Sequence, residues 1–283
     1  MRVRWVICAI LSNAPWFVVA QPAPQLKPEV LVRQVVYNEL HDHDHHGYWR
    51  YWIRQESQKG PTLAEQVETA DGPLKRVVST AGQRLSTAEE QQEEDRLNRL
   101  LNSPPEQARQ RREYAEDESR IGRILALLPD AFLFDYVGEE NDHTHLRFRP
   151  NPDYPARSIE ARLFHAMSGE LWIDPGYKRL VRLDGRLGEN VDFGYGILGR
   201  LYTGGWFRLE RTRVSATDWK TQQLELHFSG RALLLKTIAR ESSEARGGFA
   251  PVPAGMTLAQ GMKLLVPLPT TASMTSASFP GNK

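Results

Sequence analysis

The feature that most constrains the fold is a change in the apolar period along the chain. After a helical block, apolar side chains recur at every second position, as in Phe132, Phe134 and Tyr136, and turn signals such as Pro175-Gly176 separate successive runs. A period of two indicates strands, and short turns join antiparallel neighbours. We therefore predict an α+β, mainly β protein: a strongly curved antiparallel sheet of about ten strands, an open half-barrel, with a helical insertion covering its concave face.

The helical insertion is predicted over residues 86–129. Ser86-x-x-Glu89 has the pattern of a capping box, in which two side chains satisfy free amide groups at a helix start, and Pro104 suits the first position of a second helix. An apolar stripe with spacing i, i+3, i+4 and i+7 follows, and Pro129 should end it. The stripe consists of Ile121, Ile124, Leu125 and Leu128. Because the remaining positions are largely charged, these helices should lie at a surface and each bury one narrow stripe.

The N-terminal residues 1–20 have the pattern of a secretory signal peptide. Arg2 and Arg4 precede an interrupted apolar stretch, and Ala20 ends a plausible cleavage site. Cys8, the single cysteine, lies inside this stretch, so a processed chain would have no disulfide or cysteine ligand. We therefore predict an exported, periplasmic protein. Whether the signal is cleaved or kept as an anchor stays open.

Three further regions follow the signal. Residues 21–47 are predicted to form a Pro-rich linker, a short helix and a His-rich loop, residues 48–268 a single domain, and residues 269–283 a disordered tail. No other segment approaches the ~20 continuous apolar residues of a membrane helix, so the mature chain is expected to have no transmembrane segment. The formal charge of +1 gives no general attraction to nucleic acid, which is not an expected partner.

A run of histidine and aspartate is the most unusual local pattern. His41, His43, His45 and His46 could ligate a transition metal weakly, since imidazole suits zinc, copper and nickel. A solvated loop before a strand is the alternative. The run nearly matches the H-x-H-x-D-H pattern of metallohydrolases, but His45 stands where that pattern needs aspartate. No other cofactor is predicted.

A second pair, His143 and His145, is predicted to share one face of a strand, where with a nearby carboxylate it could form half of a metal site. Ordinary polar-face positions are the alternative. The sequence has no G-x-S-x-G nucleophile pattern, so no catalytic residue and no enzymatic activity are predicted.

Aromatic and apolar residues spread over the predicted sheet could line a ligand pocket. Ordinary packing of the core is the alternative for each of them. Arg147 and Arg149 could pair with an anionic headgroup at the mouth of that pocket, or lie on a solvated strand face. The predicted ligand-binding residues are Trp49, Tyr51, Ile53, Phe134, Trp172, Trp206 and Phe207.

The order of strands and helices, together with the segment Gly169–Pro175, resembles the LolA/LolB-like periplasmic lipoprotein carriers, also labelled outer-membrane lipoprotein-sorting proteins. The stretches Phe193–Gly199 and Ala232–Ile238 resemble an uncharacterised bacterial subgroup of them. The resemblance implies a half-closed barrel under a helical lid, and an apolar ligand or a lipoprotein acyl chain as cargo.

Three functions follow from these patterns. The first is an exported carrier that holds a lipid-like or other apolar ligand in a half-barrel. The second is a metal-binding protein or metallohydrolase that uses the His41–His46 run. The third is an envelope-assembly module without a ligand, in which the charged helices contact an envelope protein. The patterns do not determine the ligand, the partner or the oligomeric state.

Overall fold

The computed structural model describes residues 26–41, 47–193, 199–232 and 236–265. The predicted signal peptide, His43, His45, His46 and the predicted tail lie outside them. The helices are α1 (Pro28–Leu40), α2 (Thr87–Asn102), α3 (Pro104–Ala131), α4 (Ile159–His165) and α5 (Leu258–Leu264). The strands are β1 (Tyr48–Ser57), β2 (Thr62–Val67), β3 (Leu74–Thr80), β4 (Gln83–Arg84), β5 (Phe132–Glu140), β6 (His143–Pro150), β7 (Met167–Asp174), β8 (Arg179–Leu187), β9 (Val191–Phe193), β10 (Gly199–Leu201), β11 (Trp206–Arg213), β12 (Trp219–Ala232) and β13 (Lys236–Val252).

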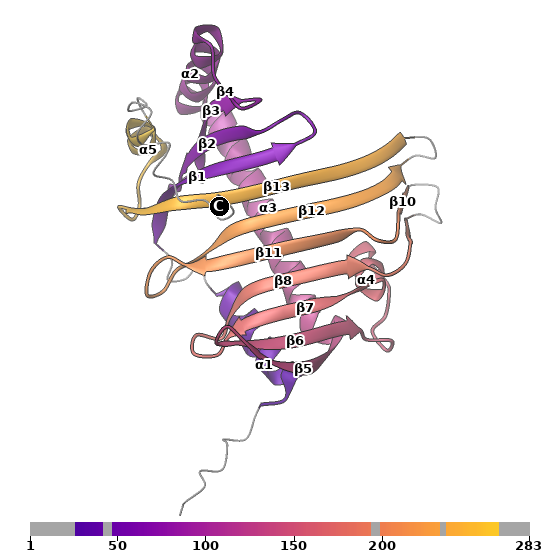
Figure 1. The fold of residues 1–283 in the computed structure, drawn as a ribbon. Helices are drawn as coiled ribbons and strands as arrows, with labels where there is room; N and C mark the ends of the chain where they lie inside the picture. Colours follow the sequence, from indigo (N-terminus) through magenta and orange to yellow (C-terminus); the bar gives the residue numbers. More distant parts are fainter. Residues whose placement is uncertain (1–25, 42–46, 194–198, 233–235, 266–283) are drawn as a thin grey trace, which may run out of the picture.

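The described strands form one antiparallel sheet that does not close into a barrel, as predicted (Figure 1). The strand order is β4-β3-β2-β1-β13-β12-β11-β8-β7-β6-β5. The short strand β10 pairs with the end of β12, and β9 pairs with β10. Most neighbours follow each other in the chain, as short turns favour. There are two exceptions along this order: β11 pairs with β8, and β13 returns from the C-terminal half and pairs with β1.

The predicted helical insertion forms α2 and α3, and α3 crosses behind the sheet (Figure 1). Ser86 and Glu89 make the predicted capping box at the start of α2. The end predicted at Pro129 was wrong by two residues, because α3 continues to the buried Ala131. Proline removes one backbone hydrogen bond, which the last turn of a helix can lose without unwinding.

The largest apolar cluster lies between α1, α3, α4 and the sheet. Helix α1 contributes a stripe in which four residues are buried, and strands β5 to β8 contribute the facing side chains. A second cluster lies where α2 and α5 pack beside β2 and β3. The buried residues of α1 are Leu31, Val32, Val35 and Val36.

A buried ion triad holds the C-terminal end of α1 on the sheet. The Glu39 carboxylate accepts two hydrogen bonds of 3.1 Å from Arg179 and one of 3.0 Å from the Leu180 amide, and it pairs with Arg211. The three charged side chains are only 6%, 9% and 13% exposed. Buried charges are tolerated when they are paired and hydrogen-bonded, as here, and this contact ties the C-terminal end of α1 to β8 and β11.

Glu39→Gln should destabilise the protein by about 3–5 kcal/mol, since it removes a buried carboxylate that two buried guanidinium groups share. Urea unfolding would measure the change. Glu113→Gln is the matched control, because Glu113 is exposed and its carboxylate lies 3.8 Å from Arg109. That variant should change stability by less than about 0.5 kcal/mol. Equal effects of the two substitutions would contradict the role assigned to the triad.

Candidate functional site

An apolar cavity of about 300 Å³ lies between the helices and the sheet. Every residue that lines it is apolar except Glu39, whose carboxylate is engaged by arginines. Helices α1, α3 and α4 enclose it on one side, and strands of the sheet form the other wall. It is lined by Val32, Val35, Val36, Glu39, Ile124, Leu125, Leu128, Phe132, Phe134, Phe148, Leu163, Phe164, Met167, Leu171, Leu180, Leu183, Phe207 and Phe228.

Two glycines shape the sheet wall of this cavity. Phe148, Gly169, Gly185 and Phe207 form one cross-strand row over β6, β7, β8 and β11. A Cβ atom on Gly169 would lie 1.9 Å from the Asp184 carbonyl oxygen, and one on Gly185 would lie 2.2 Å from the Phe207 ring. The rings of Phe148 and Phe207 therefore occupy space above the strands that a side chain on Gly169 or Gly185 would fill.

A second, more polar cleft of about 700 Å³ shares Glu39 and Leu125 with the apolar cavity. Tyr48, Tyr114 and Arg111 are among its lining residues. Burial raises the pKa of Tyr114 to about 12, with Glu118 and Glu68 acting in the same direction. The phenol, which at neutral pH is protonated even at the ordinary tyrosine pKa of about 10, can donate a hydrogen bond.

The predicted ligand-binding residues do not come together in one place. Phe134 and Phe207 line the apolar cavity. The residues Trp49, Tyr51 and Ile53 share one face of β1, as their alternation predicted, but form a separate cluster with Val214 and Phe249. Trp172 and Trp206 lie on the sheet face opposite the helices.

Sequence reasoning missed most of the cavity wall, including the buried valines of α1. The apolar stripe predicted in α3 did indicate part of this wall. Its last three members, Ile124, Leu125 and Leu128, line the cavity, whereas its first, Ile121, is 54% exposed.

Trp49 is held by a buried carboxylate. Asp218 accepts hydrogen bonds from the Trp49 indole at 3.3 Å, from the Gly47 amide at 2.6 Å and from Ser215 at 2.5 Å. Burial by itself would raise the pKa of Asp218, but the hydrogen bonds from Ser215, Gly47, Thr217 and Trp49 outweigh it and lower the pKa. The contact connects the start of β1 to the loop before β12.

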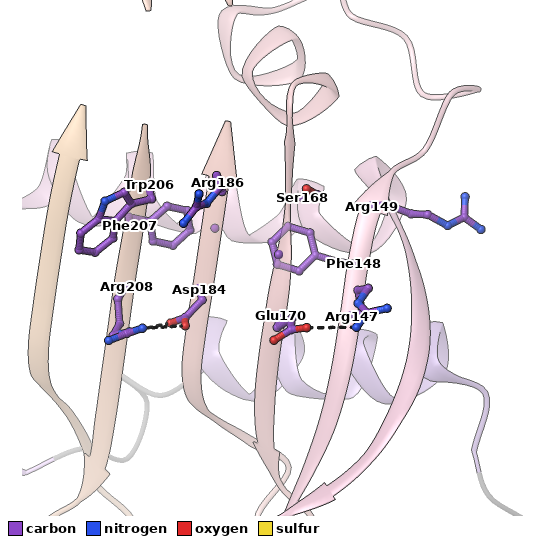
Figure 2. Close-up of a pocket in the computed structure, with 12 residues that line it drawn as sticks. Arg147, Phe148, Arg149, Ser168, Glu170, Asp184, Arg186, Trp206, Phe207 and Arg208 are labelled. Carbon is purple, nitrogen blue, oxygen red and sulfur yellow. Dashed lines mark hydrogen bonds and ion pairs between the residues drawn. The ribbon is translucent and has the colours of Figure 1, made fainter. Parts of the chain in front are cut away.

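Arg147 and Arg149, expected at the mouth of the ligand pocket, lie on the face of the sheet opposite the apolar cavity (Figure 2). They line a hollow there together with residues of β7, β8 and β11. Strand alternation explains the difference, because Phe148 between them faces the cavity.

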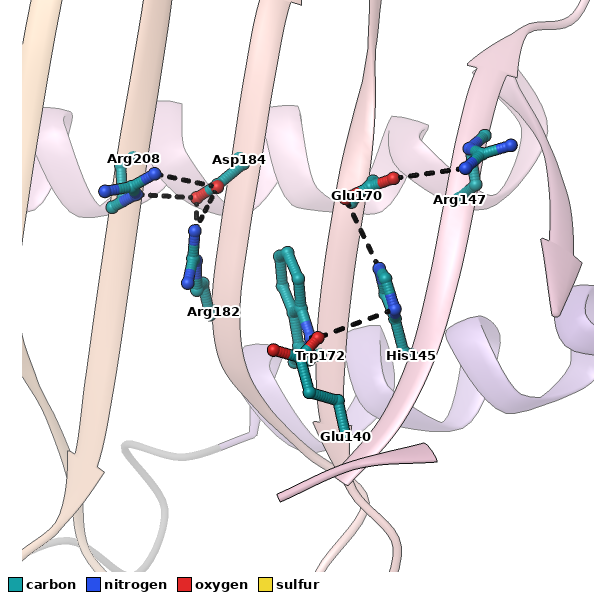
Figure 3. Close-up of polar contacts among 8 residues, drawn as sticks. All are labelled: Glu140, His145, Arg147, Glu170, Trp172, Arg182, Asp184 and Arg208. Carbon is teal, nitrogen blue, oxygen red and sulfur yellow. Dashed lines mark hydrogen bonds and ion pairs between the residues drawn. The ribbon is translucent and has the colours of Figure 1, made fainter. Parts of the chain in front are cut away.

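His145 lies beside Trp172 on the same outer face (Figure 3). The two rings stack with centroids 4.5 Å apart, and the Arg182 guanidinium lies 4.4 Å from the centroid of the indole. The His145 nitrogens lie 3.8 Å from Glu140 and 3.4 Å from Glu170.

No group of three or more His, Cys, Asp or Glu side chains suited to a metal occurs among the described residues. His41, at the end of α1, stacks on Tyr37 and contacts its carbonyl oxygen at 2.7 Å. The other three histidines of the predicted metal run lie outside the described residues, so weak metal binding there stays a prediction.

Gly169→Ala should destabilise the protein by ~3 kcal/mol or more, because the added methyl group collides with backbone atoms that cannot move alone. Gly188→Ala is the control, since its Cβ would meet the nearest atom at 3.7 Å. Thermal unfolding of both variants would measure the difference. A similar melting temperature for the two would contradict the close approach of β7 and β8.

Asp218→Asn should destabilise the protein at neutral pH, and the difference from wild type should shrink in acid. The folded pKa lies below the unfolded value of ~3.9, so the ionised carboxylate contributes stability that is lost as pH falls through the folded pKa. Urea unfolding of both proteins between about pH 7 and pH 2 would measure this. A difference that stays constant with pH would contradict it.

None of the described helices is long and apolar enough to cross a membrane. No protein-family profile and no curated protein matches the chain. Among solved structures, the chain matches the crystal structure of MucB in complex with MucA(peri), with a TM-score of 0.22 and 12% identity over 80% of this chain and 95% of that one. Likeness at this level gives no basis for assigning a shared fold or function.

Proposed function

We propose that the protein is an exported, periplasmic carrier that binds a lipid-like or other apolar ligand in the cavity between the helices and the sheet. The single observation that carries the proposal is the apolar lining of this cavity, whose one charged member, Glu39, is neutralised by arginines. The volume of about 300 Å³ lies at the lower end of the ~300–1,000 Å³ found for small-molecule sites.

The energetics of an apolar cavity support binding of a ligand. Protein interiors are close-packed, and an empty cavity forfeits dispersion contacts at roughly 24 cal/mol for each Å³. An apolar occupant of this cavity would gain such contacts with its lining. Even engineered apolar cavities of ~150 Å³ take up benzene or xenon.

The adjoining cleft supports a ligand with two chemically different ends. An apolar chain would fill the cavity beside Leu125, and a polar end would reach the cleft, where Tyr114 and Arg111 offer a hydroxyl and a guanidinium group. An acyl chain with a polar end has this division.

The test places a larger side chain in the cavity. Val35 is 4% exposed and lines the cavity, so Val35→Phe should fill part of it and weaken binding at least tenfold. The measurement is titration with the fluorescent probe N-phenyl-1-naphthylamine, followed by its displacement with dodecanoate. Thermal unfolding would verify that the variant is folded.

Val30→Phe is the matched control, because Val30 lies on the same helix and is 41% exposed. This variant should bind the probe as wild type does. Equal binding by wild type and the Val35→Phe variant, or no displacement by dodecanoate, would contradict the proposal. Separately, native mass spectrometry of the protein purified without detergent would identify the class of any retained ligand.

A further inference from the structure

The face of the sheet opposite the helices carries a hollow of about 750 Å³ over β6, β7, β8 and β11 (Figure 2). Half of the residues that line it are charged: four arginines and two carboxylates, which gives an excess of positive charge. The proposed carrier function does not use this surface. The charged residues are Arg147, Arg149, Arg186, Arg208, Glu170 and Asp184.

One cross-strand row in the hollow is internally neutralised. Arg147, Glu170, Asp184 and Arg208 are neighbours in register on four successive strands. Arg147 lies 3.4 Å from Glu170, and Asp184 lies 3.2 Å from Arg208 and 2.5 Å from Arg182 (Figure 3). Burial raises the pKa of Asp184, but hydrogen bonds from Arg182 and Arg208 outweigh it and lower the pKa, which keeps the carboxylate ionised.

The next row leaves a guanidinium without a carboxylate. Arg186 lies in register between Ser168 on β7 and Trp206 on β11. Its side chain is exposed, and no carboxylate of the described residues pairs with it within 4 Å. Arg149 pairs with Asp135 at 3.6 Å, with both side chains more than half exposed, so water or a competing anion can replace this contact at little cost.

We propose that this hollow binds an acidic segment of a protein partner, with a carboxylate on Arg186 and an adjacent apolar side chain on the Trp206 indole. Guanidinium binds carboxylate through two parallel hydrogen bonds, which gives direction as well as attraction. Tryptophan and arginine are also the residues that most often dominate protein–protein contacts.

Two features favour a protein segment over a polyanion. The carboxylates of Glu170 and Asp184 lie in the next row and repel a chain of closely spaced negative charges. The indole of Trp206 gives an apolar surface beside the single unpaired guanidinium, which matches one acidic residue flanked by apolar ones. The hollow and the apolar cavity lie on opposite faces of the sheet and share only Phe148 and Phe207 among their lining residues, so we expect partner and ligand to bind together.

The experiment uses ¹⁵N-labelled full chain and three probes: the blocked peptide Ac-Ala-Leu-Glu-Leu-Ala-NH₂, its Gln counterpart, and inorganic phosphate. The readout is the indole N–H resonance of Trp206, identified by its loss in a Trp206→Phe variant. The Glu peptide should shift this resonance saturably, and binding should weaken at least tenfold with the Gln peptide and in an Arg186→Gln variant. Arg109→Gln removes the same charge from an exposed site on α3 and should have no effect.

Several outcomes would overturn the inference. The Gln peptide could bind as tightly as the Glu peptide, or the Arg186→Gln variant could bind as wild type does. Phosphate that displaces the peptide at equal concentration would assign the site to free anions. No shift at millimolar peptide would also refute it. Unchanged resonances outside the hollow in the Arg186→Gln variant would show that its fold is intact.

Discussion

The need to remove one face of a large antiparallel sheet from water determines most of this structure. Burial of apolar area is the main favourable term in folding, and strands β5 to β8 carry apolar side chains toward α1, α3 and α4. Helix α1 packs its apolar stripe into this core and is tied to the sheet at its C-terminal end. The paired charges of Glu39, Arg179 and Arg211 do this at a position where an unpaired charge would be costly.

The cavity arises because three helices and a twisted sheet do not pack completely. The glycines of the row Phe148, Gly169, Gly185 and Phe207 let two aromatic rings lie close to the strands, and the helices lie above them. The packing of helices on the sheet thus leaves an apolar space. Our proposed function requires that an apolar ligand, rather than water, fills this space.

The two faces of the sheet carry different chemistry at adjacent residues. Phe148 lines the apolar cavity while Arg147 and Arg149 line the outer hollow, and Leu171 lines the cavity while Trp172 lies on the outer face. Strand alternation therefore gives each short stretch of sequence two environments. A ligand on one face and a protein partner on the other would use the same strands without competing for them.

The sequence by itself determined many of the local elements: most of the strands, the capping box at Ser86, the α3 stripe and the shared face of Trp49, Tyr51 and Ile53 follow from periodicity and capping, whereas α4 was not predicted. Only the tertiary structure decided that β13 lies beside β1, and which face the helices cover. Those outcomes depend on contacts between distant residues, as in the triad of Glu39 with Arg179 and Arg211. Phe134 and Phe207 line the cavity, whereas Trp172 and Trp206 lie on the other face of the sheet. All four have large apolar rings, and the sequence pattern alone does not tell which face of a strand the helices cover.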